Sequence, residues 1–312
     1  MRKAIAISVT LIAALSAIAL ADGIGPFSAF KNGIGARALA MGGAFVAVAD
    51  DASAPLWNPA GLAQITGTRL TGMSTGLSAL GSSNQYVGAV TTLADIGVGF
   101  SWNRSAVDGG LLPSVGETFV GSLATNVFGT TLAGANLKYY RAADSVGADA
   151  SGFGFDLGVL VNLDDMFVIG VNAMDLSGAT LAWNGGNTDE ITSLYKAGMA
   201  MKMADDRVVL ATDVDFDGTD VTDTHVGVEY QVIDRLALRG GVVLTDNFQE
   251  YYFAVGAGIN VGGLYVDAAY ILEEDEGNTL VISAETEFTL GERSNDDDEE
   301  EDGTEDEEDA GD

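Results

Sequence analysis

The most regular pattern in the chain is an alternation of apolar and polar positions in its central and C-terminal parts. Between residues 152 and 162 every second residue is large and apolar, and Asp156 lies on the opposite face. Residues 207–216 and 280–290 show the same alternation, with carboxylates confined to one face. A period of two residues predicts a β-strand with one apolar face and one wet face.

Such runs, each about ten residues long, occur fourteen times and are separated by turn signals. They begin near Arg69, Tyr86, Ile96, Thr118, Thr131, Gly152, Phe167, Leu194, Val208, His225, Leu236, Tyr251, Leu264 and Leu280. About ten residues is the length that a tilted strand needs to cross a bilayer. The sequence therefore predicts an all-β fold, a transmembrane antiparallel β-barrel of about 14 strands.

The lengths of the connections support a barrel over a soluble sandwich. Connections after even-numbered runs are very short, as at residues 128–129 and 262–263. Several connections after odd-numbered runs are longer, as at residues 104–116 and 175–191. Short turns at one end and longer loops at the other are typical of outer-membrane barrels.

The first residues resemble a secretory signal peptide and not part of the fold. Arg2 and Lys3 precede an apolar run over residues 4–20, and Ala-Leu-Ala at 19–21 fits a cleavage site. The apolar run is at the short end for an uncleaved membrane anchor. The predicted organisation is a signal peptide at 1–21, a plug segment at 22–64, a barrel at 65–290 and an acidic tail at 291–312.

Composition narrows the function further. The chain has no cysteine, which excludes disulfides and thiolate metal sites. Its formal net charge is −32, and residues 292–312 hold 14 acidic residues and one arginine. So acidic a surface disfavours nucleic acid as a partner. An even number of strands places the C-terminus on the periplasmic side, so the tail is expected to be a solvated periplasmic segment of a protein in a Gram-negative type of outer membrane.

One segment does not follow the strand pattern: residues 36–63, ARALAMGGAFVAVADDASAPLWNPAGLA. Its many glycines and alanines allow close backbone packing, as a plug inside a narrow barrel requires. Its aspartates can cap backbone N–H groups or pair with lumen cations, and its Asn-Pro pair favours a turn. The candidate plug motif consists of Gly42, Gly43, Asp50, Asp51, Asn58, Pro59 and Gly61. These residues either fold the plug or also contact a ligand.

Three strings in this segment carry a resemblance to a known family. Residues 35–44 (GARALAMGGA), 49–53 (ADDAS) and 57–62 (WNPAGL) resemble the N-terminal signature of the PorV/PorQ family of outer-membrane barrels. That family is similar to the FadL-type long-chain fatty-acid transporters, which carry a related segment in their plug. The resemblance implies a 14-stranded barrel with an N-terminal hatch.

The resemblance implies two functions of different kinds. PorV-type proteins serve protein secretion or surface assembly, with exported proteins or secretion-system components as partners. FadL-type proteins pass hydrophobic small molecules through the barrel and out by a lateral opening. We take the secretion role as the first expectation because the N-terminal strings are close and the outer loops are modest. FadL-like transport is the alternative, and a structural barrel in outer-membrane lipid without transport is the third.

The polar faces of the predicted strands carry charges of both signs. The candidate lumen charges are Lys138, Lys196, Arg235, Arg239, Asp156, Glu229 and Glu285. Opposite charges on one face of neighbouring strands pair across the ladder. Mutual pairing in a wet interior is therefore the simplest role, and pore selectivity is the alternative.

Two apolar segments fall in predicted outer loops. Leu111 and Leu112 belong to one of them, and Leu181 and Trp183 belong to the other. Together these four side chains are a candidate hydrophobic lip for a lipid or a partner protein. The alternative is loop packing over the mouth of the barrel.

Residues 213–220, DVDFDGTD, are similar to the start of a calcium loop, with Asp213, Asp215 and Asp217 at its first, third and fifth positions. The twelfth position is Thr224 and not glutamate, so calcium is a weak candidate and no other metal is expected. The single histidine, His225, lies in a predicted strand and has no catalytic motif around it. We expect neither enzymatic activity nor a cofactor.

Overall fold

The computed structural model describes residues 33–75, 82–107, 114–144, 147–176, 178–186, 188–218, 220–245, 250–273 and 278–288. The predicted signal peptide, residues 22–32 of the predicted plug, the acidic tail, Leu111 and Leu112 lie outside the described residues. In the described ranges, no helix combines the length and the apolar character that a membrane crossing needs.

The strands of the described residues form one antiparallel sheet. They are β1 Thr68–Thr75, β2 Ser82–Leu93, β3 Ile96–Val107, β4 Ser114–Asn126, β5 Thr131–Asp144, β6 Asp149–Asn162, β7 Phe167–Met174, β8 Ala179–Trp183, β9 Thr188–Ile191, β10 Leu194–Met203, β11 Val208–Asp217, β12 Asp220–Ile233, β13 Leu236–Thr245, β14 Glu250–Val261, β15 Leu264–Leu272 and β16 Thr279–Phe288.

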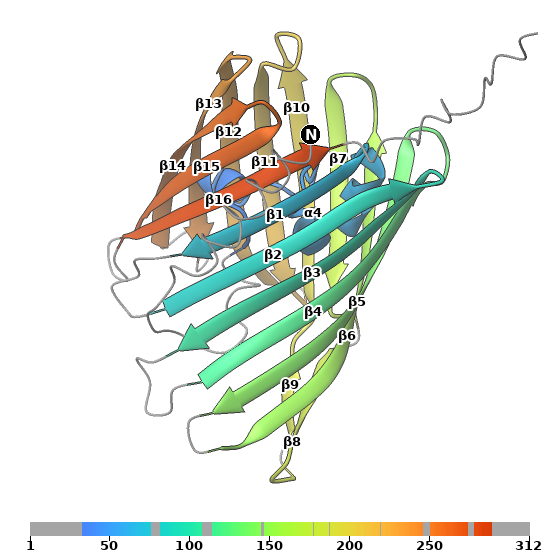
Figure 1. Cartoon of the computed structure of the whole chain (residues 1–312), viewed down its shortest axis with the longest axis vertical. Helices are drawn as coiled ribbons and strands as arrows, with labels where there is room; N and C mark the ends of the chain where they lie inside the picture. The colour runs from blue at the N-terminus through green and yellow to red at the C-terminus, as the bar shows by residue number, and fades with distance from the viewer. Residues whose placement is uncertain are drawn as a thin grey trace, which may run out of the picture.

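Fourteen of these strands close into a barrel (Figure 1). Each of these fourteen strands pairs with the next one along the chain, except that β7 pairs with β10 because β8 and β9 are not among the fourteen. The pairing of β1 with β16 joins the first strand to the last. Thr68 lies opposite Phe288 in that closing ladder. The predicted closed antiparallel barrel of 14 strands is confirmed.

Alternation along β6 separates the two faces of the wall. Phe153 and Leu157 are 66% and 46% exposed on the outside, whereas Asp156 and Leu160 are fully buried on the inside. The apolar positions that the sequence pattern groups together therefore face outward here, as on a lipid-facing wall.

Tight turns join the strands at the short-loop end of the barrel. Gly262 and Gly263 have φ angles of 63° and 85° between β14 and β15. Two consecutive residues at positive φ match the right-handed twist of the flanking strands, and glycine adopts this conformation without steric cost.

Residues 175–191 differ from the predicted outer loop. They include the hairpin of β8 and β9, in which Ala179 lies opposite Ile191. Trp183 of β8 lies opposite Ala150 of β6, so the hairpin extends the wall beyond the end of β7. Strands of five and four residues are too short to show the ten-residue alternation by which the other strands were recognised.

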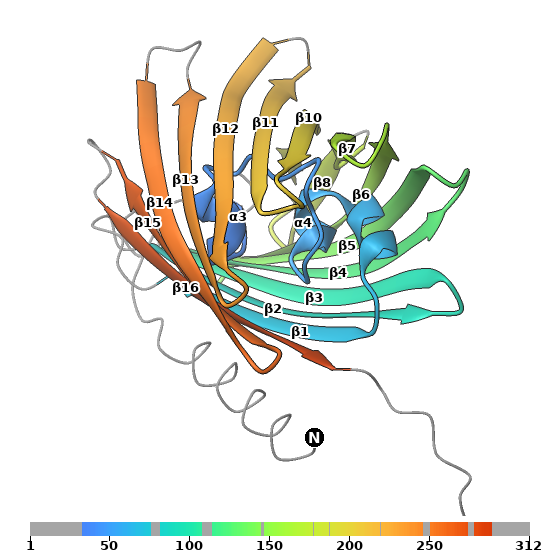
Figure 2. The ribbon, with the colours of Figure 1, turned by 90° about the horizontal axis from the view of Figure 1, so that it is seen from above.

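Residues 33–65 lie inside the barrel, and we call this segment the plug (Figure 2). It contains α3 Ala36–Ala40, α4 Ala54–Trp57 and the 3₁₀ helix η1 Pro59–Gln64. Pro55 is the second residue of α4 and Pro59 is the first residue of η1, and in the first turn of a helix a missing N–H costs nothing. These short helices pack against the inner wall, so the core of the molecule is the contact between plug and barrel.

Candidate functional site

The plug backbone touches the wall where the wall has no side chain. A Cβ on Gly134 of β5 would lie 2.3 Å from the Pro59 carbonyl carbon, and one on Gly241 of β13 would lie 2.2 Å from the Met41 carbonyl carbon. The same approach of plug backbone occurs at Gly97, Gly170 and Gly227, whereas Gly158 and Gly256 leave room for plug side-chain atoms of Asn58, Pro59 and Ala40. Glycine at these positions lets two backbones approach closely, which fixes the depth and register of the plug.

Large apolar side chains fill the remaining space between plug and wall. Phe45 and Trp57 meet edge to face with ring centroids 5.8 Å apart, and both are almost completely buried. They belong to one apolar cluster with wall residues such as Leu132, Leu160 and Val168. Burial of this kind stabilises a side chain by about 1.5–3 kcal/mol, so the plug is an integral part of the fold.

Neutral amides bind plug and wall together on the β5–β7 side. The Asn136 amide donates to the Pro55 carbonyl at 2.6 Å, and the Asn172 amide donates to the Trp57 carbonyl at 2.9 Å. Asn58 of the plug donates to the Val159 carbonyl of β6 at 3.1 Å. The bonds from Asn136 and Asn172 occupy carbonyls at the ends of short plug helices, where intrahelical partners are lacking.

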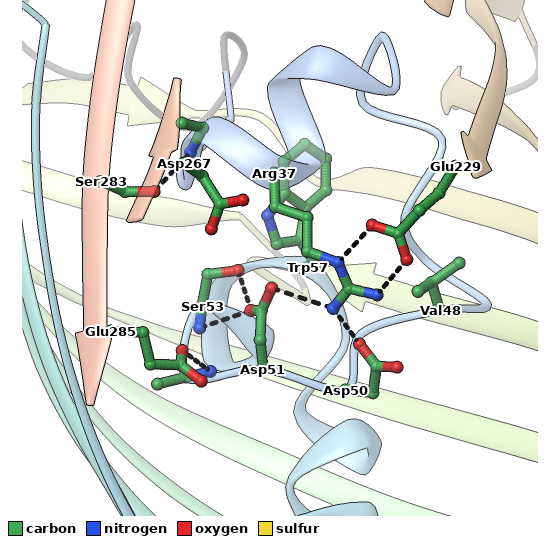
Figure 3. A network of polar contacts seen from close by, with 12 residues as sticks. Arg37, Val48, Asp50, Asp51, Ser53, Trp57, Glu229, Asp267, Ser283 and Glu285 are labelled. Atoms are coloured by element: carbon green, nitrogen blue, oxygen red, sulfur yellow. Dashed lines mark hydrogen bonds and ion pairs between the residues drawn. The ribbon is translucent and has the colours of Figure 1, made fainter. Parts of the chain in front are cut away.

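Charged groups make the connection on the opposite side, and Arg37 is their centre (Figure 3). Its guanidinium donates to both oxygens of Glu229 on β12, at 2.8 and 2.9 Å. It also donates to Asp50 at 2.5 Å and lies 3.5 Å from Asp51. A bidentate arginine–carboxylate pair is strong and directional, so α3, the Asp50-Asp51 turn and β12 are held as one unit.

The charged network continues along the wall. Glu229 accepts from Arg239 of β13 at 2.5 Å, and Arg239 pairs with Asp267 of β15 at 2.6 Å. Positive and negative groups alternate along this path, so the charges compensate one another inside the barrel.

A second branch of the network fixes the turn after Asp51. The N–H of Ala52 donates to Glu285 of β16 at 2.8 Å, and Arg69 of β1 pairs with Glu285 at 3.3 Å. Asp51 itself accepts from the N–H and the hydroxyl of Ser53. The two aspartates of the plug motif therefore have different roles. Asp50 pairs with Arg37, and Asp51 also stabilises its own turn through its bonds with Ser53.

Arg37 remains charged under all ordinary conditions. Burial lowers the pKa of its guanidinium, but the negative charges of Asp50, Glu229 and Asp51 raise it, and the net result is a pKa well above the ordinary value. Arginine is already fully protonated in proteins, so the charge state of the network is set by its carboxylates.

A further polar cluster lies inside the wall at β10–β12. Asp213 accepts from the N–H groups of Phe45 and Val46 at 2.6 and 2.8 Å. Lys196 donates to Asp215, and the His225 ring contacts the Gly42 carbonyl at 2.7 Å. This cluster holds the turn that follows α3.

The wall changes its pairing at the end of β7. Asp175 has a φ of 49° and turns inward, where it is 4% exposed and accepts from Tyr140 at 2.7 Å and from Lys138 at 3.2 Å. On this edge, β6 pairs with β7 over residues 157–162 and with β8 only at Ala150 and Ser151. Between these two ladders, residues 152–156 of β6 have no regular ladder partner on this side among the described residues. The N–H of Leu176 donates to the Phe155 carbonyl, and the N–H of Asp175 donates to the Asp156 carboxylate at 2.9 Å. We call this stretch the β6 break.

A polar cavity of about 350 Å³ lies beside the Arg37 network. Its lining includes Arg37, Arg69, Glu229, Arg235, Asp267 and Glu285. Arg235 adjoins the tight turn between β12 and β13, so the cavity lies toward the short-turn end.

The structure brings most of the sequence-predicted lumen charges into paired clusters. Lys138 contacts Asp156 at 2.7 Å, and both side chains are fully buried. Arg235 differs, because it is exposed at the end of the barrel and only lines the cavity.

Of the four residues predicted as a hydrophobic lip, Leu111 and Leu112 lie outside the described residues, so the lip stays a prediction. Leu181 is 2% exposed and packs with Tyr140, Ala142 and Ala150, while the Trp183 ring donates to Asp189 at 2.8 Å. Leu181 points inward because it alternates along β8, which the sequence pattern had placed in a loop.

The three predicted calcium ligands lie on strand β11 and not in a loop. Asp213 and Asp215 are buried and are occupied by plug N–H groups and by Lys196, whereas Asp217 ends the strand. Among the described residues, no cluster of three or more histidine, aspartate or glutamate side chains is suited to hold a metal.

Sequence reasoning missed the central residue of the site. Arg37 lies inside the quoted strings, but only the aspartates and the turn residues were singled out there. The available signal was that Arg37 is the one basic residue between residues 33 and 65. Asn136, Asn172 and Asp175 were missed as well, because single polar residues on a wet strand face look alike in sequence.

Fold and site together define a closed 14-stranded barrel that holds a buried N-terminal plug. No protein-family model and no curated protein matches the sequence. Among solved structures, the chain is similar to the Pseudomonas putida toluene transporter TodX, with a TM-score of 0.63, 15% identity, and coverage of 82% of this chain and 98% of TodX. It is also similar to a Pseudomonas aeruginosa FadL homologue, with a TM-score of 0.61, 14% identity, and coverage of 86% and 100%. At these identities the likeness establishes a FadL-like barrel fold.

Proposed function

We propose that this protein is an outer-membrane transporter that passes small hydrophobic molecules through its barrel and out sideways through the β6 break. The observation that carries the proposal is the break itself, where residues 152–156 lose their regular ladder partner. The neighbours of similar fold, described as a toluene transporter and a FadL homologue, support transport better than protein secretion.

The charge distribution supports a sideways route. A hydrophobic molecule that continued along the barrel axis would meet the plug and then the charged cavity around Arg37. An apolar molecule that filled this cavity would desolvate its charged groups at a cost. The outside of the β6 break is apolar instead, with Phe153 66% exposed and Phe155 42% exposed.

The inner side of the break carries apolar groups as well. Gly152 and Gly154 of β6 have no side chain there, and a Cβ at these positions would lie 2.3 Å from the Thr180 carbonyl oxygen and 2.1 Å from the Asp175 carboxylate. Tyr140, Ala142, Ala150, Ala179 and Leu181 form an apolar cluster next to it. This cluster is buried and packs behind the break, next to the Asp175 carboxylate that accepts from Tyr140 and Lys138.

The test uses the fact that the chain has no cysteine of its own. Phe155→Cys places a thiol at the break, and Leu157→Cys places one on the same face of β6 where pairing with β7 is regular. The two native side chains are 42% and 46% exposed, so they are matched in accessibility. Proteoliposomes containing each variant are assayed for uptake of labelled toluene and labelled oleate before and after reaction with a bulky maleimide.

We expect maleimide to reduce uptake through the Phe155→Cys variant to the level of protein-free vesicles and to leave the Leu157→Cys variant active. Equal effects on both variants would contradict a route through the break. No uptake of either compound by the unmodified chain would contradict the transport function itself.

A second candidate function is protein secretion or surface assembly of the PorV/PorQ type. Only the N-terminal strings at residues 35–44, 49–53 and 57–62 favour it. Affinity capture of the full chain from its native membrane tests this role, because a secretion barrel retains exported proteins or secretion components. Capture of the barrel alone, together with uptake in vesicles, favours the transport function.

A further inference from the structure

Two arginines on the outer surface of the barrel form a row with one glutamate. Arg104 of β3 lies opposite Glu117 of β4, and Glu117 lies opposite Arg141 of β5. All three share the outward face with exposed apolar residues such as Phe100 and Leu137. Figure 1 shows β3, β4 and β5 side by side across one face of the barrel. We call Arg104, Glu117 and Arg141 the arginine row.

The row carries more positive than negative charge. Arg141 is 57% exposed and lies 3.7 Å from Glu117, which is a loose ion pair, and Glu117 also accepts from the Trp102 ring at 3.4 Å. Within the described ranges, no ion pair is found for Arg104. Two arginines facing outward are unusual in a chain whose formal net charge is −32.

An aromatic row lies directly beside the arginine row, one outward position closer to the short-turn end. Trp102, Phe119, Tyr139 and Phe153 lie opposite one another in turn across β3 to β6. Ring centroids are 6.3 Å apart for Phe119 and Tyr139 and 5.2 Å apart for Tyr139 and Phe153. Such aromatic bands mark the level at which the hydrocarbon core of a bilayer meets its headgroups.

The depth of the arginine row fits a headgroup level. Arg141 follows the start of β5 at Thr131 by ten residues. At roughly 3.3 Å per residue and a tilt of about 40°, this is about 25 Å along the membrane normal, the usual height of the apolar band. Arg141 therefore lies at the outer edge of the apolar band, on the side of the long loops. Arg104 follows the start of β3 at Ile96 by eight residues, which is about 20 Å by the same calculation, so its long side chain reaches toward the same level.

We propose that Arg104 and Arg141 bind the phosphate headgroup of an anionic lipid in the outer leaflet. Arginine donates in a fork that matches phosphate oxygens, and its alkyl stem packs on apolar surface while the charge reaches the headgroups. The acyl chains of the same lipid pack on the aromatic row. Glu117 orients Arg141 and Trp102 and leaves the outer donors of both arginines for the lipid.

The choice of a lipid phosphate follows from the position of the arginines. Strands two apart are separated by about 9.6 Å, so two long side chains can converge on one headgroup or hold two phosphates of one lipid. The four aromatic rings beside the arginines would add nothing to the binding of a soluble anion, which has no acyl chain to pack on them. The inference rests on the outer-membrane orientation, with the long loops outside, and not on the identity of the transported molecule.

The experiment measures lipid binding to the full chain in nanodiscs of phosphatidylcholine that contain increasing amounts of phosphatidic acid. The number of retained phosphatidic acid molecules per barrel is read by native mass spectrometry. The test variant is Arg104→Gln with Arg141→Gln. The matched control is Arg207→Gln, which removes an arginine of similar exposure, 51%, from a loose ion pair with Asp234 at 3.4 Å near the short turns.

We expect the double variant to bind phosphatidic acid about 30-fold more weakly, since each basic residue near a membrane surface contributes about a fivefold gain in affinity. The Arg207→Gln control is expected to bind as the native chain does. Diacylglycerol, which has the same chains without phosphate, is expected to show no difference between the native chain and the double variant.

Three results would overturn the proposal: equal retention by the double variant and the native chain, an equal loss in the Arg207→Gln control, or full displacement of the lipid by inorganic phosphate at the same concentration. Folding is checked by the heat-dependent gel mobility of the barrel. A second variant, Arg104→Lys with Arg141→Lys, keeps both charges and should lose less affinity than the glutamine variant. A larger loss in the lysine variant would also contradict the proposal.

Discussion

The two sides of the barrel hold the plug by different interactions. On the β12–β16 side the contact runs through charges, from Asp50 and Arg37 to Glu229. On the β5–β7 side it runs through neutral amides, such as Asn136 and Asn172 donating to plug carbonyls. Charged pairs also occur on that side, as between Lys138 and Asp156, but they connect wall residues to one another.

The difference has a consequence for transport. The β6 break lies on the side where the plug presents carbonyls and apolar side chains, and the charged cavity lies on the other side. In the proposed transport, a hydrophobic molecule can pass the neutral side without disturbing the ion pairs that hold the plug. The charged side is then the fixed attachment and the neutral side is the side of passage.

Removing Arg37, the central cation of the charged side, is the strongest test of the difference between the two sides. Arg37→Met removes the cation that pairs with Asp50 and one of the two arginines that pair with Glu229, and the Arg37 side chain is only 19% exposed. Breaking a buried pair by removing one partner costs about 4 kcal/mol. We expect a matching loss in the free energy of unfolding, measured by urea titration of the detergent-solubilised barrel.

The control for this variant is Arg207→Met. Arg207 pairs with Asp234 at 3.4 Å, but the two side chains are 51% and 92% exposed. Exposed pairs contribute less than about 1 kcal/mol, so this variant should unfold almost as the native chain does. Similar losses in the two variants would show that the Arg37 network does not fasten the plug.

A close backbone contact on the neutral side is tested by Gly134→Val. The first atom of the new side chain would lie 2.3 Å from the Pro59 carbonyl carbon, which is backbone and cannot rotate away. Overpacking of this kind costs about 3 kcal/mol. We expect lower stability in urea together with faster proteolysis of the plug.

Gly121→Val is the matched control for that change. Gly121 lies on the outer face of the neighbouring strand β4, and a Cβ there would meet nothing within 4 Å. This variant should keep the native stability and the native rate of proteolysis. If both variants behave alike, the cost comes from valine in a strand and not from contact with the plug.

The barrel was predictable because its signals are local. A period of two residues and the alternation of short and long connections can be read from neighbouring residues, and the expected starts at Ile96, Thr131 and Phe167 are the observed ones. The hairpin of β8 and β9 was missed because it pairs with β6 through only two residues. That pairing depends on the end of β7 at Met174, which no local sequence pattern predicts.

The polar site was predictable only as a set of charges. The sequence left open whether Asp50 would cap backbone N–H groups or pair with a lumen cation, and its partner in the structure is Arg37 of the same plug segment and not a wall residue. Several basic side chains could pair with an aspartate of the plug, and which of them does so depends on how the plug turns between α3 and α4. The roles of Asn136 and Asn172 depend on which plug carbonyls lie opposite them.

The smallest effect expected in this comparison is that of Asn58→Ala. Asn58 is fully buried, donates to the carbonyls of Val46 and Val159 at 3.0 and 3.1 Å, and accepts from the Ala60 N–H at 3.1 Å. Leaving these buried groups without a partner costs about 1–2 kcal/mol in the free energy of unfolding. The control Asn126→Ala removes one exposed bond to the Gly129 carbonyl and should cost less than about 0.5 kcal/mol.

Salt separates this neutral contact from the charged one. Because salt screens charges and leaves neutral hydrogen bonds almost unchanged, the loss caused by Asn58→Ala should be the same in low and high sodium chloride, measured by urea titration. The loss caused by Arg37→Met should shrink by a small amount at high salt, because the pairs that Arg37 makes are partly buried and are screened less than exposed pairs. An equal salt dependence of the two losses would mean that the two sides of the barrel do not hold the plug by different interactions.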